Sequence, residues 1–336
     1  MKITLAHGSG GELTNRLIER VIMKKIKLKE FKEGIGIPAL DDGASIPFDE
    51  FDIVLTTDSH TVKPIFFPGG DIGKLSVCGT INDLAVMGAK PMAILSSFVI
   101  EEGFEVSDLE KILSSMDSVS KALNVPIIGG DTKVMGKGEL DEIIITTTGI
   151  GIANKKSLTL DSNVRIGDKI ILSGTIGDHG IAILTSREGF EVEGEIKSDL
   201  NEIWTMVEGV IDKVNAMKDP TRGGLSAALI DFASKSNVGI EIFEDRIPIK
   251  KEVKSICEML GLNPYDLTNE GKVVIAVSPE NADSVLEHLR STYQGKEAQI
   301  IGEATDTYAG KVILNTVVGG KRFLERPIGD PIPRIC

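Results

Sequence analysis

The segment that best indicates the fold class is residues 92–132, MAILSSFVIEEGFEVSDLEKILSSMDSVSKALNVPIIGGDT. Its apolar run at 92–100 is typical of a buried β-strand. The next part predicts a helix, because Ser107-Asp-Leu-Glu110 has the capping-box pattern and apolar residues recur at helical spacing until Asn124 and Pro126 stop them. A strand that alternates with a helix in this way favours an α/β or α+β protein.

The same patterns extend over the rest of the chain. Helices are predicted at 11–25, 72–87, 199–215, 224–235 and 279–291. Strands are predicted at 53–57, 92–100, 142–153, 168–173, 238–243, 272–277, 298–302 and 311–317. The polar stretch between Gly149 and Gly167 is the expected boundary, which divides the chain into domains at 1–155 and 156–318 and a tail at 319–336.

The composition is that of a globular protein with a large core. The chain has 336 residues, of which 41% are hydrophobic, and a net charge of −13 that repels nucleic acid but accommodates a basic protein partner. No stretch approaches the roughly 20 apolar residues that span a bilayer, and the start MKITLAHGSGG lacks a signal-peptide core. We therefore expect a cytoplasmic protein, with Cys78 and Cys257 as small core residues.

The last ten residues, Pro327-Ile-Gly-Asp-Pro-Ile-Pro-Arg-Ile-Cys336, form a proline-rich segment that ends in a thiol. Proline fixes φ and lacks an N–H, so we expect this segment to run extended, over roughly 30 Å at about 3.1 Å per residue. Such an arm suits a swinging carrier hinged near Gly319-Gly320 or Gly329, and Arg334 would favour the thiolate. The alternative is a terminal cysteine without a role.

Aspartates follow apolar runs at four places in the N-terminal half. These are Asp41-Asp-Gly-Ala44, Thr56-Thr-Asp58, Asn82-Asp83 and Gly129-Gly-Asp-Thr132. Ligands gather where strands end, converging carboxylates need a cation, and oxygen ligands suit Mg²⁺ bridged to nucleotide phosphates. The four motifs together therefore predict an Mg-ATP site, whereas any one of these aspartates alone would more often cap a turn or a helix.

Two glycine-rich segments precede predicted helices. Gly8-Ser-Gly-Gly11 and Asp219-Pro-Thr-Arg-Gly-Gly224 each offer N–H groups and a helix dipole to phosphate, although either alone is more often a turn. The chain has no G-x-x-x-x-G-K-[ST] motif, so a triphosphate must be held in another way. Neither segment matches the dinucleotide pattern, which argues against an oxidoreductase.

Lys133 and Glu270 are the candidates for proton transfer. Lys133 follows the Gly-Gly-Asp-Thr motif and is as readily a solvated surface lysine. Glu270 stands at the entrance of the predicted strand 272–277, where a turn residue is the simpler interpretation. The four histidines show no zinc spacing, so these two residues carry the acid–base hypothesis.

Several motifs together resemble the HypE family of hydrogenase-maturation factors. They are His7-Gly-Ser-Gly-Gly-Glu12, Asp41-Asp-Gly-Ala44, Thr57-Asp-Ser-His60, Asn82-Asp83, Gly129-Gly-Asp-Thr132, Asp219-Pro-Thr-Arg-Gly-Gly224 and Pro333-Arg-Ile-Cys336. The aspartate and glycine motifs are shared with the superfamily of aminoimidazole ribonucleotide synthetase (PurM-like) and selenophosphate synthetase. Pro-Arg-Ile-Cys at the end is the element specific to HypE.

The resemblance implies a PurM-like α/β (α+β) fold of two domains, with N-terminal sheets that pair across a homodimer and a flexible C-terminal tail. It implies that Cys336 receives a carbamoyl group from HypF, and that ATP-dependent dehydration, a lyase reaction, makes it a thiocyanate. The cyano group would then pass to iron on the HypC–HypD complex and end as a ligand of [NiFe] hydrogenase.

The resemblance also implies a role for each site residue. Asp42, Asp58, Asp83 and Asp131 would hold Mg²⁺ and ATP, Thr132, Gly10, Gly11, Thr221, Gly223 and Gly224 would contact the nucleotide, Cys336 would carry the substrate, and Lys133 and Glu270 would move protons. A selenophosphate synthetase or thiamine-phosphate kinase would need no terminal thiol, and the former places a reactive cysteine or selenocysteine near its start, where this chain has none. A non-enzymatic scaffold would not turn over ATP.

Overall fold

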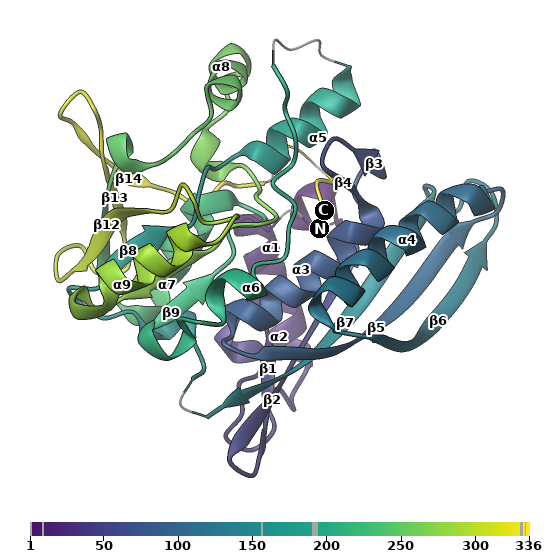
Figure 1. The fold of residues 1–336 in the computed structure, drawn as a ribbon, viewed down its shortest axis with the longest axis horizontal. Coiled ribbons are helices and arrows are strands. Elements are labelled where there is room, and N and C mark those ends of the chain that lie inside the picture. Colours follow the sequence, from purple (N-terminus) through teal and green to yellow (C-terminus); the bar gives the residue numbers. More distant parts are fainter. Residues whose placement is uncertain (1, 9, 156, 190–193, 330–331, 333) are drawn as a thin grey trace.

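The computed structural model describes residues 2–8, 10–155, 157–189, 194–329, 332 and 334–336. Each half of the chain builds one large sheet, and the C-terminus lies near the middle of the view where the halves meet (Figure 1). The N-terminal sheet has the order β1 (Ala44–Phe48), β2 (Phe51–His60), β7 (Ile143–Asn154), β5 (Lys90–Glu101) and β6 (Ile127–Met135). A mixed α/β architecture is confirmed.

Two helices cover one face of the N-terminal sheet. They are α3 (Ile72–Val86) and α4 (Val106–Leu123), whose apolar side chains share a core with β5 and β7. Buried residues alternate along the whole of β7, because every second side chain points towards the helices. Asp71 begins α3 by accepting hydrogen bonds from the N–H groups of Gly73 and Lys74. Nearly all of α3 is buried, so this helix forms the centre of the molecule.

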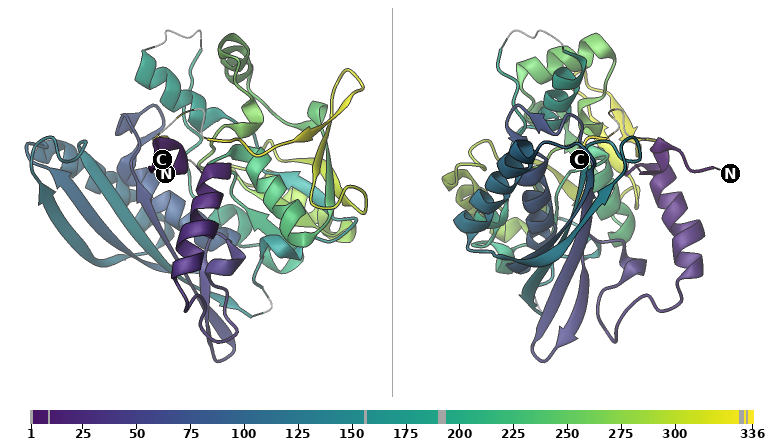
Figure 2. Two further views of the ribbon diagram at one scale, coloured as in Figure 1. Left: turned by 180° about the vertical axis from the view of Figure 1, so that it is seen from behind. Right: turned by 90° about the vertical axis from the view of Figure 1, so that its right-hand side faces the viewer.

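The other face of the N-terminal sheet is only partly covered. Here α1 (Glu12–Leu17) and α2 (Met23–Lys25), joined by a π-helical turn at Ile18–Ile22, stand on the side opposite α3 (Figure 2, right). Ile46, Phe51 and Leu95 lie on this outer face and remain exposed. An apolar sheet face without full cover is available for a partner.

The C-terminal half is a three-layer arrangement around a seven-stranded sheet. In spatial order its strands are β14 (Lys321–Leu324), β13 (Val312–Asn315), β10 (Gly239–Phe243), β12 (Gln299–Thr305), β8 (Lys169–Leu172), β11 (Val274–Val277) and β9 (Ala216–Lys218). Ile170 and Leu172 face α7 (Gly224–Ser236), whereas Ile171 faces α9 (Pro279–Ser291) and α6 (Trp204–Val207). The sequence patterns did not predict α5 (Asp178–Glu188) or α8 (Lys251–Leu260).

Two predicted helical features are wrong. Val106 is the first residue of α4 and no side chain caps it, so Ser107 lies inside the helix and the capping box does not form. Of the helix predicted at 199–215, only α6 and a 3-10 turn at Ile211–Lys213 form. The Asn82 amide oxygen accepts from the N–H of Ile203, and the N–H of Ser198 donates to Pro68, so tertiary contacts hold this segment extended.

The tail begins inside the sheet. Gly319 and Gly320 form the turn between β13 and β14, so the hinge expected there is part of a hairpin. Further on, Ile332 and Ile335 are buried in the core, whereas Pro331 and Pro333 lie outside the described residues. The tail is therefore docked in this structure, and its mobility stays a prediction.

The interpretation of Cys78 and Cys257 as core residues is confirmed. Cys78 and Cys257 are buried, and both lie in the same large core. Across the described ranges, no helix combines the length and apolar character needed to cross a membrane.

Candidate active site

Three aspartates converge where the two halves of the molecule meet. Asp42 precedes β1, Asp83 lies on α3, and Asp219 follows β9. One carboxylate oxygen from each lies within 4.8 Å of the other two. Oxygen atoms at this spacing can share one hard divalent cation.

The electrostatics of this cluster favour a bound cation. Burial, reinforced by neighbouring carboxylates, raises the pKa of Asp42 to about 6 and that of Asp219 to about 8, and holds the pKa of Asp83 well above its usual value. Among the described residues, the buried Oδ1 atom of Asp219 has no hydrogen-bond partner. A divalent cation would neutralise the repulsion and occupy this atom, so the donor set fits Mg²⁺.

Lys218 is the counter-ion of the cluster. Its Nζ lies 2.8 and 3.0 Å from the two carboxylate oxygens of Asp42 and 3.1 Å from Asp161. Burial would lower the pKa of Lys218, but Asp161 and Asp42 outweigh burial and raise it well above its usual value. A buried, permanently charged lysine therefore fixes the orientation of Asp42.

Arg222 connects the cluster to the end of the chain. One guanidinium nitrogen lies 3.8 Å from Asp58, and another donates to the carbonyl of Gly8 at 3.3 Å. The negative charge of Cys336 is the largest cause of the raised pKa of Arg222. The terminal residue, Arg222 and Asp58 therefore lie in one charged group beside the aspartate cluster.

Glu270 is buried near this group, because the charges of Asp58 and Arg222 both act on its pKa. Burial is the main reason why its pKa lies well above its usual value, with Asp219 and Asp199 adding to the effect. Its Oε1 atom has no hydrogen-bond partner within the described part of the chain. The Asn82 amide nitrogen donates to the carbonyl of Glu270 at 3.3 Å, which places the motif Asn82-Asp83 and Glu270 together. The deprotonated form of such a carboxyl is a strong proton acceptor.

The two glycine-rich segments differ in what they contact. Gly223 and Gly224 have φ of 81° and 61°, and a Cβ on Gly224 would lie 2.5 Å from the carbonyl of Tyr265, so only glycine fits the turn that leads into α7. Thr221 lies in this turn, where its carbonyl accepts from the N–H of Gly224. The segment therefore follows directly from Asp219, and its role in phosphate binding stays a prediction.

The N-terminal glycine segment contacts protein. A Cβ on Gly10 would lie 2.4 Å from the Cβ of Arg222, and one on Gly11 would lie 2.4 Å from the carbonyl of Pro327. The N–H groups that follow, of Glu12 and Leu13, donate to the carbonyls of Pro327 and Ile328. In this structure the start of α1 therefore contacts the tail, and the phosphate contact expected of Gly10 and Gly11 stays a prediction.

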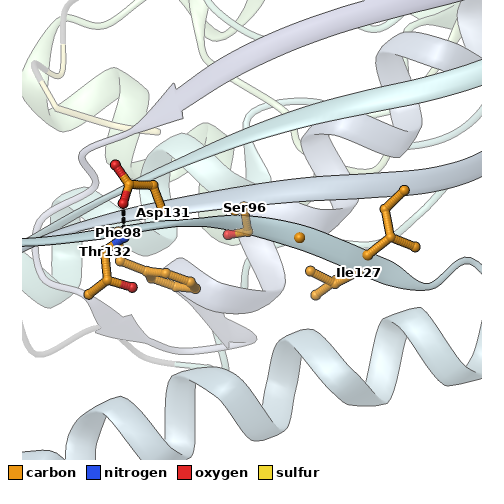
Figure 3. Close-up of a pocket in the computed structure, with 8 residues that line it drawn as sticks. Ser96, Phe98, Ile127, Asp131 and Thr132 are labelled. Carbon is orange, nitrogen blue, oxygen red and sulfur yellow. Dashed lines mark hydrogen bonds between the residues drawn. The ribbon is translucent and has the colours of Figure 1, made fainter.

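Asp131, Thr132 and Lys133 lie outside this cluster. The strand pairing aligns Asp131 on β6 with Ser59 on β2. Three strand spacings of about 4.8 Å separate these two residues, which amounts to roughly 14 Å. The Asp131 side chain points to the face opposite that of Asp58, and Figure 3 shows Asp131 and Thr132 on opposite sides of β6. Lys133 is exposed and pairs with Asp131 at 2.7 Å. These residues do not meet Glu270 within one subunit.

Three site residues were absent from the predicted set. Asp219 and Arg222 belong to the motif Asp219-Pro-Thr-Arg-Gly-Gly224, in which the predicted site residues are Thr221, Gly223 and Gly224, and Lys218 directly precedes it. The motif follows a short strand, so the rule that ligands gather at strand ends would have selected Asp219. Nothing in the sequence indicates that Lys218 reaches Asp42.

Comparison with known proteins identifies the family. Models of the N-terminal and C-terminal domains of AIR synthase related protein match residues 40–153 and 165–315. The chain is 43% identical to carbamoyl dehydratase HypE of Rhizobium leguminosarum bv. viciae, covering 100% of this chain and 95% of that one. It is 43% identical, with a TM-score of 0.86, to a chain of a HypE–HypF complex, covering 93% of this chain and 99% of that one.

A solved HypE structure in complex with ATP is also similar, with a TM-score of 0.83, 35% identity and 100% of both chains covered. These similarities extend over both domains and the tail, well beyond the motifs that the superfamily shares. The chain belongs to the HypE family of hydrogenase maturation proteins, within the AIR synthase related proteins.

Proposed function

We propose that this protein is a carbamoyl dehydratase that uses ATP to convert an S-carbamoyl group on Cys336 into a thiocyanate. The observation that carries the proposal is the docking of Cys336 on Thr61, just beyond β2, where its charge acts on Arg222, whose guanidinium lies 3.8 Å from Asp58. Support also comes from the relative named carbamoyl dehydratase HypE and from the similar structure with bound ATP. The product is a precursor of the cyanide ligands of [NiFe] hydrogenase.

The chemistry requires a leaving group and a base. The carbamoyl oxygen attacks the γ-phosphate of ATP, and it then leaves as phosphate while the nitrogen loses two protons and C≡N forms. Asp42, Asp83 and Asp219 would hold Mg²⁺, with Asp58 beside them, and this ion would neutralise the charge of the triphosphate. The turn of Thr221, Gly223 and Gly224 is a phosphate contact in this proposal.

Glu270 and Arg222 act on the reacting group. Glu270 accepts a proton from nitrogen, because a buried carboxyl with a raised pKa binds that proton strongly. Arg222, which the charge of Cys336 already stabilises, orients the terminal residue towards Asp58. Arg222 therefore has the role of positioning the substrate arm.

A homodimer formed through the N-terminal sheets is part of the proposal. The outer sheet face exposes Ile46, Phe51 and Leu95, which a second subunit would bury. Asp131 and Lys133 lie on that same face at the edge strand β6. In a dimer Asp131 and Lys133 can reach the partner's nucleotide, which would reconcile their assigned roles with their distance from Asp58. The nucleotide contact of Thr132, which points to the other face of β6, stays a prediction.

The proposed partners follow from the reaction. A HypF carbamoyltransferase supplies the carbamoyl group, as the similar HypE–HypF complex supports, and a HypC–HypD complex receives the cyano group on iron. All these steps would take place in the cytoplasm. Each partner must reach Cys336, so the tail has to leave its docked position at least once in each cycle.

Intact mass spectrometry tests the proposal. After incubation with the carbamoyltransferase, its carbamoyl donor and Mg-ATP, the protein should first gain a carbamoyl group and then lose the mass of one water. Omitting ATP should stop it at the carbamoyl state, and Cys336→Ser should gain neither group. A protein that accepts the carbamoyl group but never loses water with ATP would be a scaffold and not a dehydratase.

A further inference from the structure

The loop that carries Asp42 contains an unusual backbone conformation. Leu40 has a φ of 52° and a ψ of 34°, in the left-handed region that residues other than glycine rarely adopt. It follows the 3-10 turn Ile37–Ala39, and its N–H donates to the carbonyl of Ile37 at 3.2 Å. Asp41 and Asp42 come next, so the direction of the chain at Asp42 depends on the conformation of Leu40. Contacts from elsewhere must hold a residue of this kind in place.

Lys235, the second-last residue of α7, reaches this loop from the C-terminal half. Its Nζ donates to the carbonyl of Leu40 at 2.5 Å and to the carboxylate of Asp41 at 3.0 Å. A third hydrogen bond, of 2.7 Å, goes to Asp161. An ammonium group has three protons to donate, and these three bonds use all of them. Lys235 therefore fixes the main chain at Leu40 as well as the residue directly before Asp42.

Asp161 connects Lys235 with Lys218. It is 2% exposed and begins the 3-10 turn Asp161–Asn163, in the segment that joins the two large sheets. Its Oδ2 atom accepts from Lys235 at 2.7 Å and from Lys218 at 3.1 Å. Burial would raise the pKa of Asp161, but the two lysines outweigh burial and lower it, so this carboxylate stays charged. Asp161 therefore holds both ammonium groups beside the loop that carries Asp42.

The two lysines hold different parts of this loop. Lys218 binds the side chain of Asp42 through both carboxylate oxygens, at 2.8 and 3.0 Å. Lys235 binds the main chain two residues earlier, at the carbonyl of Leu40. A metal ligand needs both kinds of support, because its side chain can reach the ion only when its main chain is also in place. The contact with Lys235 is therefore a second condition for the position of Asp42.

We propose that Lys235 positions the metal site by holding Leu40 in its left-handed conformation, which places Asp42 beside the other two aspartates of the cluster. This inference rests on the proposed function, because it requires Asp42 to bind Mg²⁺. Lys235 belongs to the C-terminal half and Asp42 to the N-terminal half, so the contact also makes the metal site depend on the junction of the two halves.

Two measurements test this role without any turnover. The exchange rate of the Leu40 N–H in the metal-free protein reports the loop, because its hydrogen bond to Ile37 exists only while the turn is formed. Calorimetry without nucleotide reports the Mg²⁺ affinity. Lys235→Met should raise this exchange rate and weaken Mg²⁺ binding by roughly 10–100-fold, the usual effect of removing a group that orients a metal ligand. Lys235→Arg keeps the charge and several donors, so it should recover part of the affinity.

Ser236→Ala is the matched control, because it changes the neighbouring residue of the same helix. The Ser236 hydroxyl donates to the carbonyl of Asp161 at 2.8 Å and accepts from the N–H of Val164 at 3.1 Å, so the contacts removed are those of the segment 161–164. This variant should change neither the exchange rate nor the Mg²⁺ affinity. Adding Leu40→Gly to Lys235→Met should restore part of the affinity, because glycine adopts the left-handed conformation without support.

The outcomes separate the inference from the proposed function. Denaturant titration shows which variants fold, and Lys235→Gln, which keeps a donor and should lose less affinity, replaces Lys235→Met if that variant does not fold. Parent Mg²⁺ affinity in the folded variant, or an equal loss in Ser236→Ala, would overturn the inference. If Asp42→Asn weakens Mg²⁺ binding and Lys235→Met does not, the inference alone fails. If Asp42→Asn leaves the affinity unchanged, Asp42 is not a ligand, and the proposed metal site fails together with the inference.

Discussion

Lys218 reaches Asp42 from the other half of the molecule, with its Nζ 2.8 and 3.0 Å from the two carboxylate oxygens. Asp161 at 3.1 Å and Asp231 at 4.0 Å complete its surroundings. Asp231 also pairs with Arg326, immediately before the proline-rich last ten residues. One buried lysine thus connects the aspartate cluster, the junction of the halves and the origin of the tail.

Replacing this lysine should destabilise the protein strongly. Lys218→Met would leave Asp42 without its cation and the 2% exposed Asp161 with Lys235 alone, and breaking a buried ion pair from one side costs about 3–5 kcal/mol. The free energy of unfolding, from denaturant titration, measures the loss. Lys169→Met is the matched control, since its partly exposed pair with Glu303 contributes about 0–1 kcal/mol. Equal losses in the two variants would contradict this role.

Metal binding should strengthen as the pH rises. Asp42 and Asp219 have pKa values raised to about 6 and about 8, so each must lose a proton before it binds a cation. We expect Mg²⁺ affinity, measured by calorimetry, to rise between pH 5.5 and 8.5 by up to roughly tenfold per pH unit for each proton displaced. Asp219→Asn should weaken binding and flatten the upper part of this profile. A pH-independent affinity would show that these carboxylates are not the ligands.

The raised pKa of Asp219 also predicts how the stability of the protein changes with pH. The pKa of Asp219 in the folded state is raised above its usual 3.8, so the folded state binds this proton more tightly than the unfolded state does. The contribution of Asp219 to the free energy of unfolding therefore falls as the pH rises from about 4 towards 8. Asp219→Asn removes the titrating carboxyl and therefore the loss of stability at high pH. Without metal, the variant should melt at a higher temperature than the parent at pH 8.5, with the difference shrinking at pH 4.5. A difference that grows towards low pH would reverse the assignment.

Local sequence patterns predicted the helices and strands whose conformation depends mainly on the residues within them. The run at 72–87 forms α3, and the run at 142–153 forms β7. The helix predicted at 199–215 failed because Asn82 and Pro68, distant in sequence, hold that segment extended. The strand β6 was missed because Gly129 and Gly130 resemble a turn, whereas a Cβ on Gly130 would lie 1.6 Å from the carbonyl of Ser96 on β5.

The sequence predicted those site residues whose own motif indicates a metal ligand. Asp42 and Asp83 are predicted as ligands because each follows an apolar run, and the structure brings them together with Asp219. Lys218 and its contact with Asp42 were not predictable, because a long-range ion pair leaves no periodic trace in a single sequence. The same limit explains Asp131, whose motif resembles the others although the sheet places it on the opposite face.

Glu270 should be needed for proton transfer but not for binding. Glu270→Gln keeps the size of the side chain and removes a buried carboxyl whose pKa is raised, so the fold should be retained. We expect ATP affinity within about twofold of the parent and dehydration slowed by roughly 10²–10⁴-fold, the usual contribution of a general base. Intact mass would then show Cys336 trapped in the carbamoyl state. Dehydration at the parent rate would remove Glu270 from the mechanism.

Mixing two inactive variants tests whether Asp131 acts across a dimer. Asp83→Asn should weaken Mg-ATP binding directly, because Asp83 lies in the aspartate cluster. Asp131 lies roughly 14 Å from Ser59, the neighbour of Asp58, so we expect Asp131→Asn to weaken the same site only in a partner subunit. A mixed dimer would then hold one site with both substitutions and one site with neither. Random mixing of the two variants should therefore restore roughly one quarter of the parent activity. Light scattering checks that the mixture is dimeric, and a mixture that stays inactive while Asp131→Asn alone is impaired would rule out sharing between subunits.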